Sequence, residues 1–146
     1  MNSLGYPLKE MILRMDSQGS GKYGSSRGGG SRKHNGTDFL VKEGDSIFAP
    51  FDGVVTRQAY PYDNDRFYTG LHLKSLDGKT LMKVFYMKPL SAIIGKEVKK
   101  GDLIGKAQDI SKKYSPKMKP HIHVEIWDTT SNTTSDPQQF FGLSPI

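Results

Sequence analysis

Short runs of alternating apolar and polar residues, separated by glycine, proline and aspartate, occupy the chain from residue 37 onward. Runs of β-branched and aromatic residues that end at turn-forming residues are typical of β-strands. The pattern predicts strands at Thr37–Leu40, Ser46–Ala49, Gly53–Ala59, Gly70–Ser75, Thr80–Met87, Ile93–Val98, Leu103–Ala107 and His121–Trp127. Many short strands joined by turns predict an all-β sandwich or barrel.

The segments between these runs are predicted to be turns and loops. Asp77-Gly78 is a strong hairpin signal, because Asp-Gly suits the left-handed backbone of a tight turn. Three polar stretches lack a strand pattern and are predicted to be loops: Tyr60–Arg66, Lys112–Pro120 and Thr129–Ser135. Asp136–Ile146 is predicted to be a C-terminal tail.

Two different patterns precede the first of these strands. Gly5–Met15 is weakly amphipathic and favours either a short helix or a strand. Ser17–Lys33 is rich in glycine and serine, which predicts a long loop without a regular element. A glycine-rich loop that leads into a polar cluster often lines a site, and a disordered linker is the alternative.

One sequence unit occurs twice. Val41–Ile47 matches Val98–Ile104, and each unit is predicted to be a strand end, a tight Gly-Asp turn and a return strand. The unit resembles one in lipoyl and biotinyl carrier domains, so it supports a β-sandwich without choosing a function. A carrier needs a lysine at a hairpin tip within a short hydrophobic and acidic motif, which this chain lacks. A carrier or adaptor is therefore the distant alternative.

Composition narrows the class of protein. A chain of 146 residues is long enough for a hydrophobic core, and we predict a single domain over residues 1–146. Because there is no cysteine, disulfides and thiolate ligands are excluded, and a metal must be held by histidine and carboxylate, which suits zinc. No apolar run is as long as a membrane span. Met1–Glu10 has no apolar stretch typical of a signal peptide, which leaves open a cytosolic protein or one whose leader is not part of this sequence.

The chain is basic, with a formal net charge of +6 and lysines gathered in Lys96–Lys106 and Lys112–Lys119. A basic surface suits nucleic acid, anionic cell-wall polymers or an acidic membrane face. No nucleic-acid motif accompanies the charge, and aromatic residues are not interleaved with it. We therefore predict no nucleic-acid partner, and solvated turns account for most of the lysines.

Three of the four histidines lie in two compact motifs. Residues with even spacing in an extended chain face the same side, so His34 and Asp38 can point at one ion. His121, His123 and Glu125 share a face for the same reason. Histidine nitrogens and a carboxylate oxygen are the ligands of an open zinc site, whose fourth position holds a water that can become a nucleophile. A polar strand edge is the alternative for either motif taken alone.

The motifs and their order resemble the lysostaphin-type (LytM) zinc metallopeptidase domain. The resemblance rests on His34-x-x-x-Asp38, Ala49-Pro50-x-x-Gly53-x-Val55, Tyr86, Gly101-Asp102 and His121-x-His123-x-Glu125, and it spans about residues 24–141. It implies a small antiparallel β-sandwich with long loops and a groove above the metal. It also implies that His34, Asp38 and His123 bind one zinc ion, with His121 as a catalytic residue beside it.

Local motifs are similar to the leukocyte cell-derived chemotaxin (LECT-type) branch of that family, namely Pro61-Tyr62-x-Asn64 and Lys83-x-Phe85-Tyr86-x-Lys88-Pro89. Members of that branch keep the zinc ligands and are regarded as secreted signalling proteins without peptidase activity. This chain departs from them in having no cysteine, so a bacterial or otherwise divergent relative is an equal alternative. The family implies secretion or a place in the cell envelope, but the sequence leaves the compartment open.

A second catalytic histidine is the main point of departure from the family's peptidases. They carry Tyr-x-His-Leu-Ser, whereas this chain has Tyr86-Met87-Lys88-Pro89-Leu90-Ser91, so Lys88 stands in place of the expected histidine. A charged Lys88 can stabilise an oxyanion, but it cannot act as a neutral base unless its pKa falls far below about 10.4. The resemblance therefore predicts lost or reduced peptidase activity and a role in binding a protein, peptide, cell-wall or cell-surface ligand. The alternative is an active zinc metalloendopeptidase that cleaves glycine-containing or peptidoglycan peptides.

His72 lies within the strand pattern Gly70–Ser75. Pairing across the Asp77-Gly78 turn places it opposite Lys83, and alternation then turns it away from Lys88. We predict a surface histidine on a strand, and a replacement for the missing catalytic histidine is the alternative.

Overall fold

The computed structural model describes residues 5–17, 19–27 and 32–143, and strands form most of their regular structure. One large antiparallel sheet has the order β11 (Glu97–Val98), β7 (Gly53–Ala59), β8 (Gly70–Ser75), β9 (Thr80–Phe85), β13 (His121–Asp128) and β14 (Thr133–Ser135). β5 (Thr37–Leu40) pairs with the first half of β13, on the same edge that β14 pairs with further along. The prediction of an antiparallel all-β fold is confirmed.

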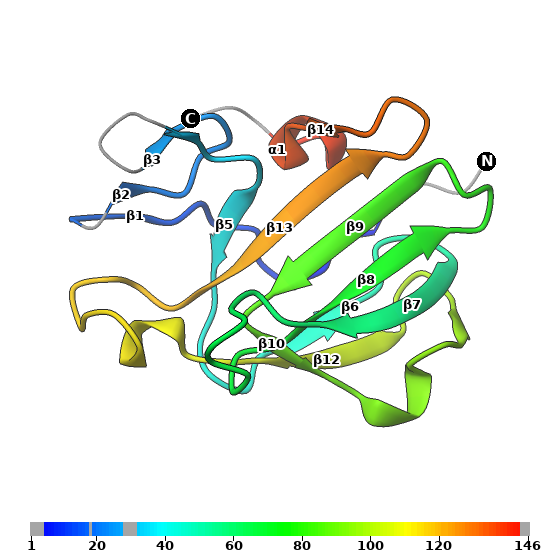
Figure 1. The fold of residues 1–146 in the computed structure, drawn as a ribbon, viewed down its shortest axis with the longest axis horizontal. Helices are drawn as coiled ribbons and strands as arrows, with labels where there is room; N and C mark the ends of the chain where they lie inside the picture. Colours follow the sequence, from blue (N-terminus) through cyan, green and yellow to red (C-terminus); the bar gives the residue numbers. More distant parts are fainter. Residues whose placement is uncertain (1–4, 18, 28–31, 144–146) are drawn as a thin grey trace.

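A second, three-stranded sheet packs against one face of the large sheet (Figure 1). It has the order β10 (Met87–Pro89), β12 (Leu103–Ala107) and β6 (Ser46–Phe48). Because side chains alternate along a strand, every second one is directed between the sheets. The fully buried side chains of this core come from both sheets: Ile47, Val55, Leu71, Leu73, Met82, Val84, Met87, Ile104, Ile122 and Val124. The alternate, mostly polar residues of the large sheet therefore lie on its opposite face.

One predicted strand, Thr80–Met87, is divided where the chain passes from one sheet to the other. Its first part is β9 and its last residue begins β10. Tyr86 separates the two with a φ of 67°, a left-handed conformation that ends the pairing along β9. Its backbone N–H and that of Met87 both donate to Thr69 O, at 2.9 and 3.1 Å. The sequence shows no glycine, proline or other turn residue at this point, so the pattern did not reveal the break.

The other strand predictions differ in how well their bounds agree with the structure. β5, β7, β8 and β12 have the predicted bounds, β6 ends one residue early, and β13 ends one residue late. Ile93–Val98 forms a strand only at β11, after a single 3-10 turn, η2 (Ser91–Ile93). Thr129–Ser135, predicted to be a loop, contains β14, whose polar residues pair with the end of β13. A strand stabilised by pairing at an edge needs no apolar alternation, so its sequence resembles that of a loop.

The helices of the described residues are all short. Besides η2 they are η3 (Ile110–Lys112) and α1 (Pro137–Phe140). α1 lies in the predicted C-terminal tail, where the Asp136 side chain accepts the Gln138 N–H at 2.9 Å and caps the helix. None of these helices is long and apolar enough to cross a membrane.

The N-terminal third also differs from its prediction. Gly5–Met15 is neither a helix nor a strand over its length, and a single bridge joins Leu13 to Phe39. Ser17–Lys33 is not one irregular loop, because two-residue ladders lie within and beside it: β1 (Met15–Asp16) with β2 (Gly19–Ser20), and β3 (Ser26–Arg27) with β4 (Arg32–Lys33). Residues 18 and 28–31 of this segment lie outside the described residues.

The repeated sequence unit forms two equivalent turns. The turn glycines, Gly44 and Gly101, have φ values of 89° and 91°, which side chains other than glycine rarely adopt. In each turn the next aspartate accepts the backbone N–H three residues before it, at 2.8 Å for Asp45 and 2.9 Å for Asp102. Each glycine N–H also donates to a residue near the other unit, at 2.8 Å in both cases: Gly44 to Ala107 O and Gly101 to Ala49 O. The repeat therefore builds the second sheet by pairing its two copies.

Candidate metal centre

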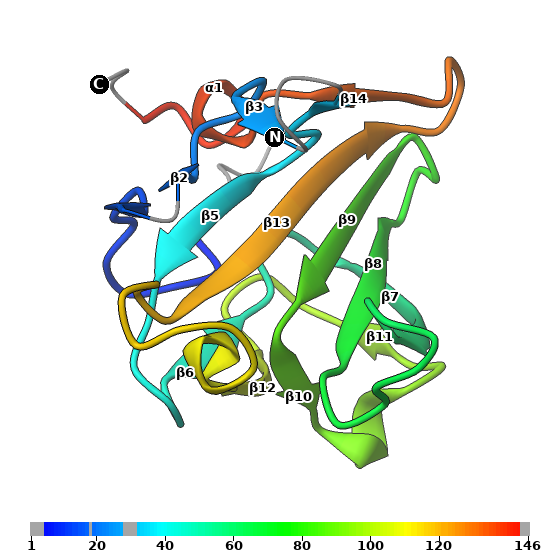
Figure 2. The same ribbon diagram turned by 60° about the vertical axis from the view of Figure 1, so that its left-hand side comes forward.

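Two neighbouring strands bring the predicted metal ligands together. β5 pairs with β13 (Figure 2), and the register of this pairing places Asp38 directly opposite His123. The flanking residues Phe39 and Ile122 are fully buried in the core, so alternation turns Asp38 and His123 to the opposite face of the sheet. His34 precedes β5 by three residues and joins them there.

A glycine allows the segment before β5 to approach β13 closely. A Cβ at Gly36 would lie 2.4 Å from Val124 O and 2.9 Å from His123 Nε2. Both distances are shorter than contacts between non-bonded atoms allow, so a larger residue must move the strand or the ligand ring. Gly36, in the first histidine motif, is therefore required for the close approach of this segment to β13 and His123.

Three potential ligand atoms face one another. His34 Nε2 lies 3.0 Å from His123 Nδ1, and Asp38 Oδ1 lies 2.9 Å from His123 Nδ1 and 3.3 Å from His34 Nε2. Ligand atoms on a tetrahedral zinc ion with bonds of about 2.0–2.1 Å lie about 3.3 Å apart. The three atoms therefore form a triangle of nearly the size that one zinc ion requires.

Hydrogen bonds on the outer side of each imidazole aim a lone pair at the centre of this triangle. His123 Nε2 lies 2.9 Å from Glu125 Oε2, and His34 Nδ1 lies 3.2 Å from Lys22 O. Since both oxygens can only accept, each of those nitrogens carries the hydrogen, and the opposite nitrogen of a neutral ring carries none. Trp127 Nε1 donates to Glu125 Oε1 at 2.8 Å and holds this carboxylate in place. Two lone pairs and a carboxylate then converge, which is favourable only with a cation between them.

The buried charges around the site also suit a divalent cation. The side chains of Arg14, Asp16, Asp38 and Glu125 are all 10% exposed or less. One of them is positive and three are negative, which leaves two negative charges in excess. Buried charge that is not compensated is strongly unfavourable. One Zn²⁺ ion has the charge that makes this cluster neutral.

Without a metal, a proton supplies part of that positive charge. Burial opposes a charge on His123, but hydrogen bonds to Asp38 and Glu125 outweigh it and raise its pKa to about 9. Burial also opposes the charge on Asp38, yet hydrogen bonds from His123 and His34 hold its pKa well below the usual range. A metal ion that binds here therefore displaces a proton from His123.

His121 lies beside the three candidate ligands and is not part of their triangle. Its Nδ1 donates to Lys119 O at 2.8 Å, so Nε2 of the neutral ring has no hydrogen. Nε2 lies 3.6 Å from Asp38 Oδ2, on the side of the metal centre. Burial lowers the pKa of His121, although the neighbouring Asp38 opposes this. A neutral imidazole in this orientation is suited to accept a proton.

A cavity of about 630 Å³ lies over the metal centre, and tyrosines form part of its wall. The Tyr62 hydroxyl lies 3.2 Å from that of Tyr86 and is hydrogen-bonded to that of Tyr114. The Tyr86 ring stands edge-on to His121, with ring centroids 5.5 Å apart. Burial raises the pKa of Tyr86 to about 12, and burial with two phenol neighbours raises that of Tyr62. Both phenols are therefore protonated at neutral pH.

The structure does not bring Lys88, the predicted stand-in for a catalytic histidine, to this site. Lys88 is exposed on β10, opposite Lys106 of β12, and does not line the cavity. Tyr86, two residues earlier, lines it instead. The reason is the left-handed turn at Tyr86, which directs its side chain towards His121 and takes the following residues into the other sheet.

His72 lies opposite Lys83, as predicted, and is half-buried on β8. It is one of four residues paired in a row across the polar face of the large sheet: Arg57, His72, Lys83 and Glu125. Burial and the two neighbouring cations lower the pKa of His72 to about 4. His72 does not line the cavity over the metal centre, so its position does not support a catalytic role.

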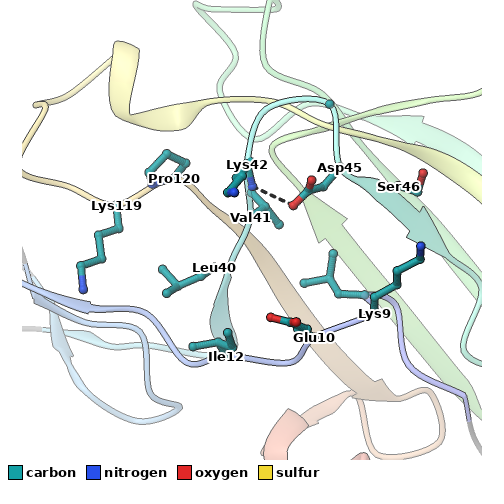
Figure 3. A pocket seen from close by; sticks show the side chains of 12 residues that line it. Lys9, Glu10, Ile12, Leu40, Val41, Lys42, Asp45, Ser46, Lys119 and Pro120 are labelled. Carbon is teal, nitrogen blue, oxygen red and sulfur yellow. Dashed lines mark hydrogen bonds between the residues drawn. The ribbon is translucent and has the colours of Figure 1, made fainter.

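A second hollow, of about 710 Å³, lies between the N-terminal segment and the ends of β5 and β6 (Figure 3). Its walls combine apolar side chains such as Leu40 and Val41 with exposed charged ones such as Lys9, Glu10 and Lys42. No histidine lines it, so it is not the metal centre.

Two features of the site were not predicted from the sequence. Arg14, which contacts Asp38, precedes it by 24 residues in a segment without periodicity. The only cue was an arginine between apolar residues in a weakly amphipathic stretch. The contact between Tyr62 and Tyr114 joins loops 52 residues apart, and no spacing rule connects them.

Similarity to known proteins agrees with this arrangement. The sequence profile of Peptidase family M23 matches residues 32–137, which contain His34, Asp38, His121 and His123. The chain therefore belongs to peptidase family M23. Leukocyte cell-derived chemotaxin-2 of Mus musculus is 34% identical to it over 123 residues, which are 84% of this chain and 77% of the relative. The predicted resemblance to the lysostaphin-type family and to its chemotaxin branch is confirmed.

Solved structures share the fold. The solution structure of lysostaphin aligns with a TM-score of 0.67 and 20% identity, over 94% of this chain and 60% of that one. A zinc containing peptidase from Vibrio cholerae aligns with a TM-score of 0.64 and 22% identity, over 92% of this chain and 39% of that one. This chain thus spans less than two thirds of either protein, and identities this low establish the fold alone. Together with the three facing ligand atoms, family membership indicates a metal site in this chain.

Proposed function

We propose that this chain binds one zinc ion through His34, Asp38 and His123, and that it binds a peptide, protein or cell-surface ligand beside the metal with its peptidase activity lost or much reduced. The observation that carries the proposal is that His121 is the only histidine besides the proposed ligands that lines the cavity over the metal centre among the described residues, and that Lys88, which stands where the family's peptidases have a histidine, does not line it. Peptidases of this family, by the resemblance described above, have a second histidine in this segment of the chain.

His121 and Tyr86, whose rings face each other, differ in their ability to transfer a proton. A bound zinc ion supplies a Lewis acid and acidifies a bound water. His121 can accept a proton at Nε2, because Lys119 O holds the hydrogen on Nδ1. The Tyr86 phenol, with a pKa of about 12, donates a hydrogen bond but exchanges its proton poorly near neutral pH. The site therefore has one of the two imidazoles that peptide cleavage is expected to use.

The cavity suits ligand binding in other respects. Aromatic rings offer large contact areas, and their hydroxyls give polar contacts at little cost in side-chain entropy. Tyr62, Tyr86 and Tyr114 present both features within a cavity of about 630 Å³. Similarity to a protein named leukocyte cell-derived chemotaxin-2 supports a binding or signalling role. A secreted or cell-envelope location would fit such a ligand.

The second candidate is an active zinc metalloendopeptidase for glycine-containing or peptidoglycan peptides. The observation in its favour is His121, which keeps the orientation of a general base beside the metal centre. An enzyme of this kind would use the tyrosine hydroxyls only as hydrogen-bond donors towards the developing charge.

One experiment separates the two functions. The zinc content of the purified protein is measured, and the same preparation is assayed with glycine-rich and cross-linked cell-wall peptides. We expect one zinc per chain and no turnover above that of His121→Ala. Turnover by the wild type that His121→Ala abolishes would establish the enzyme instead.

A pair of variants then tests the role of Tyr86. Tyr86→His should create or raise turnover, because it adds an imidazole opposite His121, and histidine tolerates a left-handed φ better than most residues. Lys88→His is the matched control, since it adds the same imidazole two residues away on the exposed strand β10. Activity gained at position 88 and not at position 86 would contradict this assignment.

A further inference from the structure

We propose that Arg14 is a positioning residue of the metal centre. It holds Asp38 with one carboxylate oxygen towards the metal, and through Asp16 it connects Asp38 to the loop that orients His121. The inference rests on the proposed zinc site and concerns a residue that precedes the region matched by the family profile, which begins at residue 32.

The side chain of Arg14 contacts Oδ2 of Asp38, whereas Oδ1 is the oxygen near His34 and His123. Arg14 Nε donates to Asp38 Oδ2 at 3.2 Å, whereas Asp38 Oδ1 lies 2.9 Å from His123 Nδ1. The two oxygens of this carboxylate are therefore assigned to different partners. A carboxylate held in this way offers one oxygen to a metal, as an open tetrahedral site requires.

Backbone contacts tie the arginine to the same residue. The Arg14 N–H donates to Asp38 O at 2.8 Å, and the Asp38 N–H donates to Gly21 O at 2.8 Å. Gly21 in turn donates to Arg14 O at 2.7 Å, and a Cβ on Gly21 would lie 2.8 Å from Asp38 Cβ. The segment that carries Arg14 thus packs directly along β5, and the guanidinium has little freedom to leave Asp38.

Asp16 extends the connection to the side of the site where His121 lies. Arg14 Nη1 lies 3.0 Å from both carboxylate oxygens of Asp16. Asp16 Oδ2 also accepts the backbone N–H of Lys119 at 2.8 Å, and Lys119 O accepts the hydrogen on His121 Nδ1 at 2.8 Å. A continuous set of hydrogen bonds therefore links the metal ligand Asp38 to the residue that orients His121.

An electrostatic role and a positioning role of Arg14 predict opposite changes in zinc affinity when Arg14 is replaced, so a measurement of that affinity separates them. Arg14 is a buried cation near the proposed Zn²⁺ ion, so its charge alone weakens metal binding by repulsion. If Arg14 acted only through its charge, its neutral replacement would bind zinc more tightly. If Arg14 positions Asp38, the neutral replacement binds zinc more weakly, because both carboxylate oxygens are then free to rotate.

The experiment compares the wild type with Arg14→Gln, Arg14→Lys and the control Arg57→Gln, an exposed arginine on β7. Zinc dissociation constants are measured by competition with a chromophoric chelator. We expect Arg14→Gln to bind zinc about 10 to 100-fold more weakly. Arg14→Lys should lose less, since its ammonium can replace one of the two contacts, and Arg57→Gln should match the wild type.

The absorption spectrum of the cobalt-substituted proteins gives a readout that a merely structural role would not change. Four-coordinate Co²⁺ absorbs visible light more strongly than five-coordinate Co²⁺. We expect weaker absorption in Arg14→Gln, because the second oxygen of Asp38 becomes able to join the ion. An unchanged spectrum together with unchanged or tighter zinc binding would overturn the inference.

Folding and the proposed function have separate controls. If Arg14→Gln does not fold, the same two measurements on Arg14→Lys decide: zinc binding within threefold of the wild type, with the wild-type cobalt spectrum, overturns the inference. If the wild type itself binds no zinc, the proposed function fails first. Zinc binding by the wild type that is indifferent to Arg14 overturns only the inference.

Discussion

At the scale of single residues, the groups behind the ligands define the metal centre. Glu125 and the carbonyl of Lys22 set which nitrogen of each imidazole faces the candidate metal centre, and Arg14 contacts one carboxylate oxygen of Asp38. In contrast to these groups, Thr37, next to Asp38 on β5, has a polar atom whose hydrogen bonding is not satisfied within the described part of the chain. Its Oγ1 is buried and has no hydrogen-bond partner among the described residues.

Replacement of this threonine should therefore stabilise the protein. An unsatisfied buried polar atom costs about 1–3 kcal/mol, and valine has nearly the same shape without the hydroxyl. We expect Thr37→Val to raise the free energy of unfolding by about 1 kcal/mol in chemical denaturation of the metal-free protein.

A second buried threonine provides the matched control. Thr69 Oγ1 donates to Met87 O at 2.8 Å, so Thr69→Val should lower the free energy of unfolding by about 1 kcal/mol. Equal effects of the two replacements would show that Thr37 Oγ1 has a partner after all.

At the scale of the elements, β13 connects the core with the site. Its odd-numbered residues His121, His123 and Glu125 lie on the side of the candidate metal centre, and its even-numbered neighbours fill the core between the sheets. The polar face continues across β9 and β8 through Lys83 and His72. His72 lies half-buried on this face beside the cations Lys83 and Arg57, which affects how stability depends on pH.

His72 should make the fold sensitive to acid. Its pKa of about 4 in the folded protein is lower than the ordinary value near 6.5, because of burial and the positive charges of Lys83 and Arg57, which Glu125 only partly offsets. The unfolded chain therefore binds this proton more tightly. The contribution to stability is complete above about pH 6.5 and is lost as the pH falls towards 4.

The test compares the wild type with His72→Gln, both metal-free, at about pH 7 and about pH 4.5. We expect the wild type to lose about 1 kcal/mol more than the variant, a value reduced for solvent screening of a half-exposed side chain. Identical losses in urea denaturation would show that His72 does not titrate with a lowered pKa.

At the scale of the whole molecule, the proposed ligands join distant parts of the chain. His34 and Asp38 belong to the N-terminal part, and His123 lies near the end of the sequence. An ion bound to all three connects β5 with β13 and compensates the excess negative charge of the buried cluster. A ligand that binds only the folded state raises stability by mass action.

Removal of the metal should therefore lower the melting temperature. We expect a decrease of at least about 5 °C with chelator. A tightly bound ion contributes several kcal/mol to stability, and each kcal/mol shifts the melting temperature by a few degrees. The measurement is a thermal unfolding scan with and without chelator. His34→Ala is the control, because its melting temperature should not respond to chelator. An unchanged curve after verified removal of the metal would contradict a stabilising role.

Particular residues show how much of the fold and of the candidate site could be predicted from the sequence. The even spacing of His121 and His123 was enough to place both on one face of a strand, because alternation is a local property of an extended chain. The bounds of β5, β7, β8 and β12 followed from the same property. His34 lies before β5, so its place beside Asp38 also depends on the close approach of Gly36 to β13. The sequence did not show that Lys88 lies outside the cavity, because Tyr86, two residues earlier, adopts a positive φ that no local pattern required.

Neighbouring residues in the chain were sufficient to indicate the all-β class, the candidate metal ligands and the turns of the repeated unit. The folded chain was needed to show that Asp38 lies opposite His123, that Tyr86 faces His121, and that Arg14 contacts Asp38. These pairs are separated by 85, 35 and 24 positions in the sequence. Contacts of this kind follow from how sheets and loops pack around one core, and that packing is a property of the whole chain.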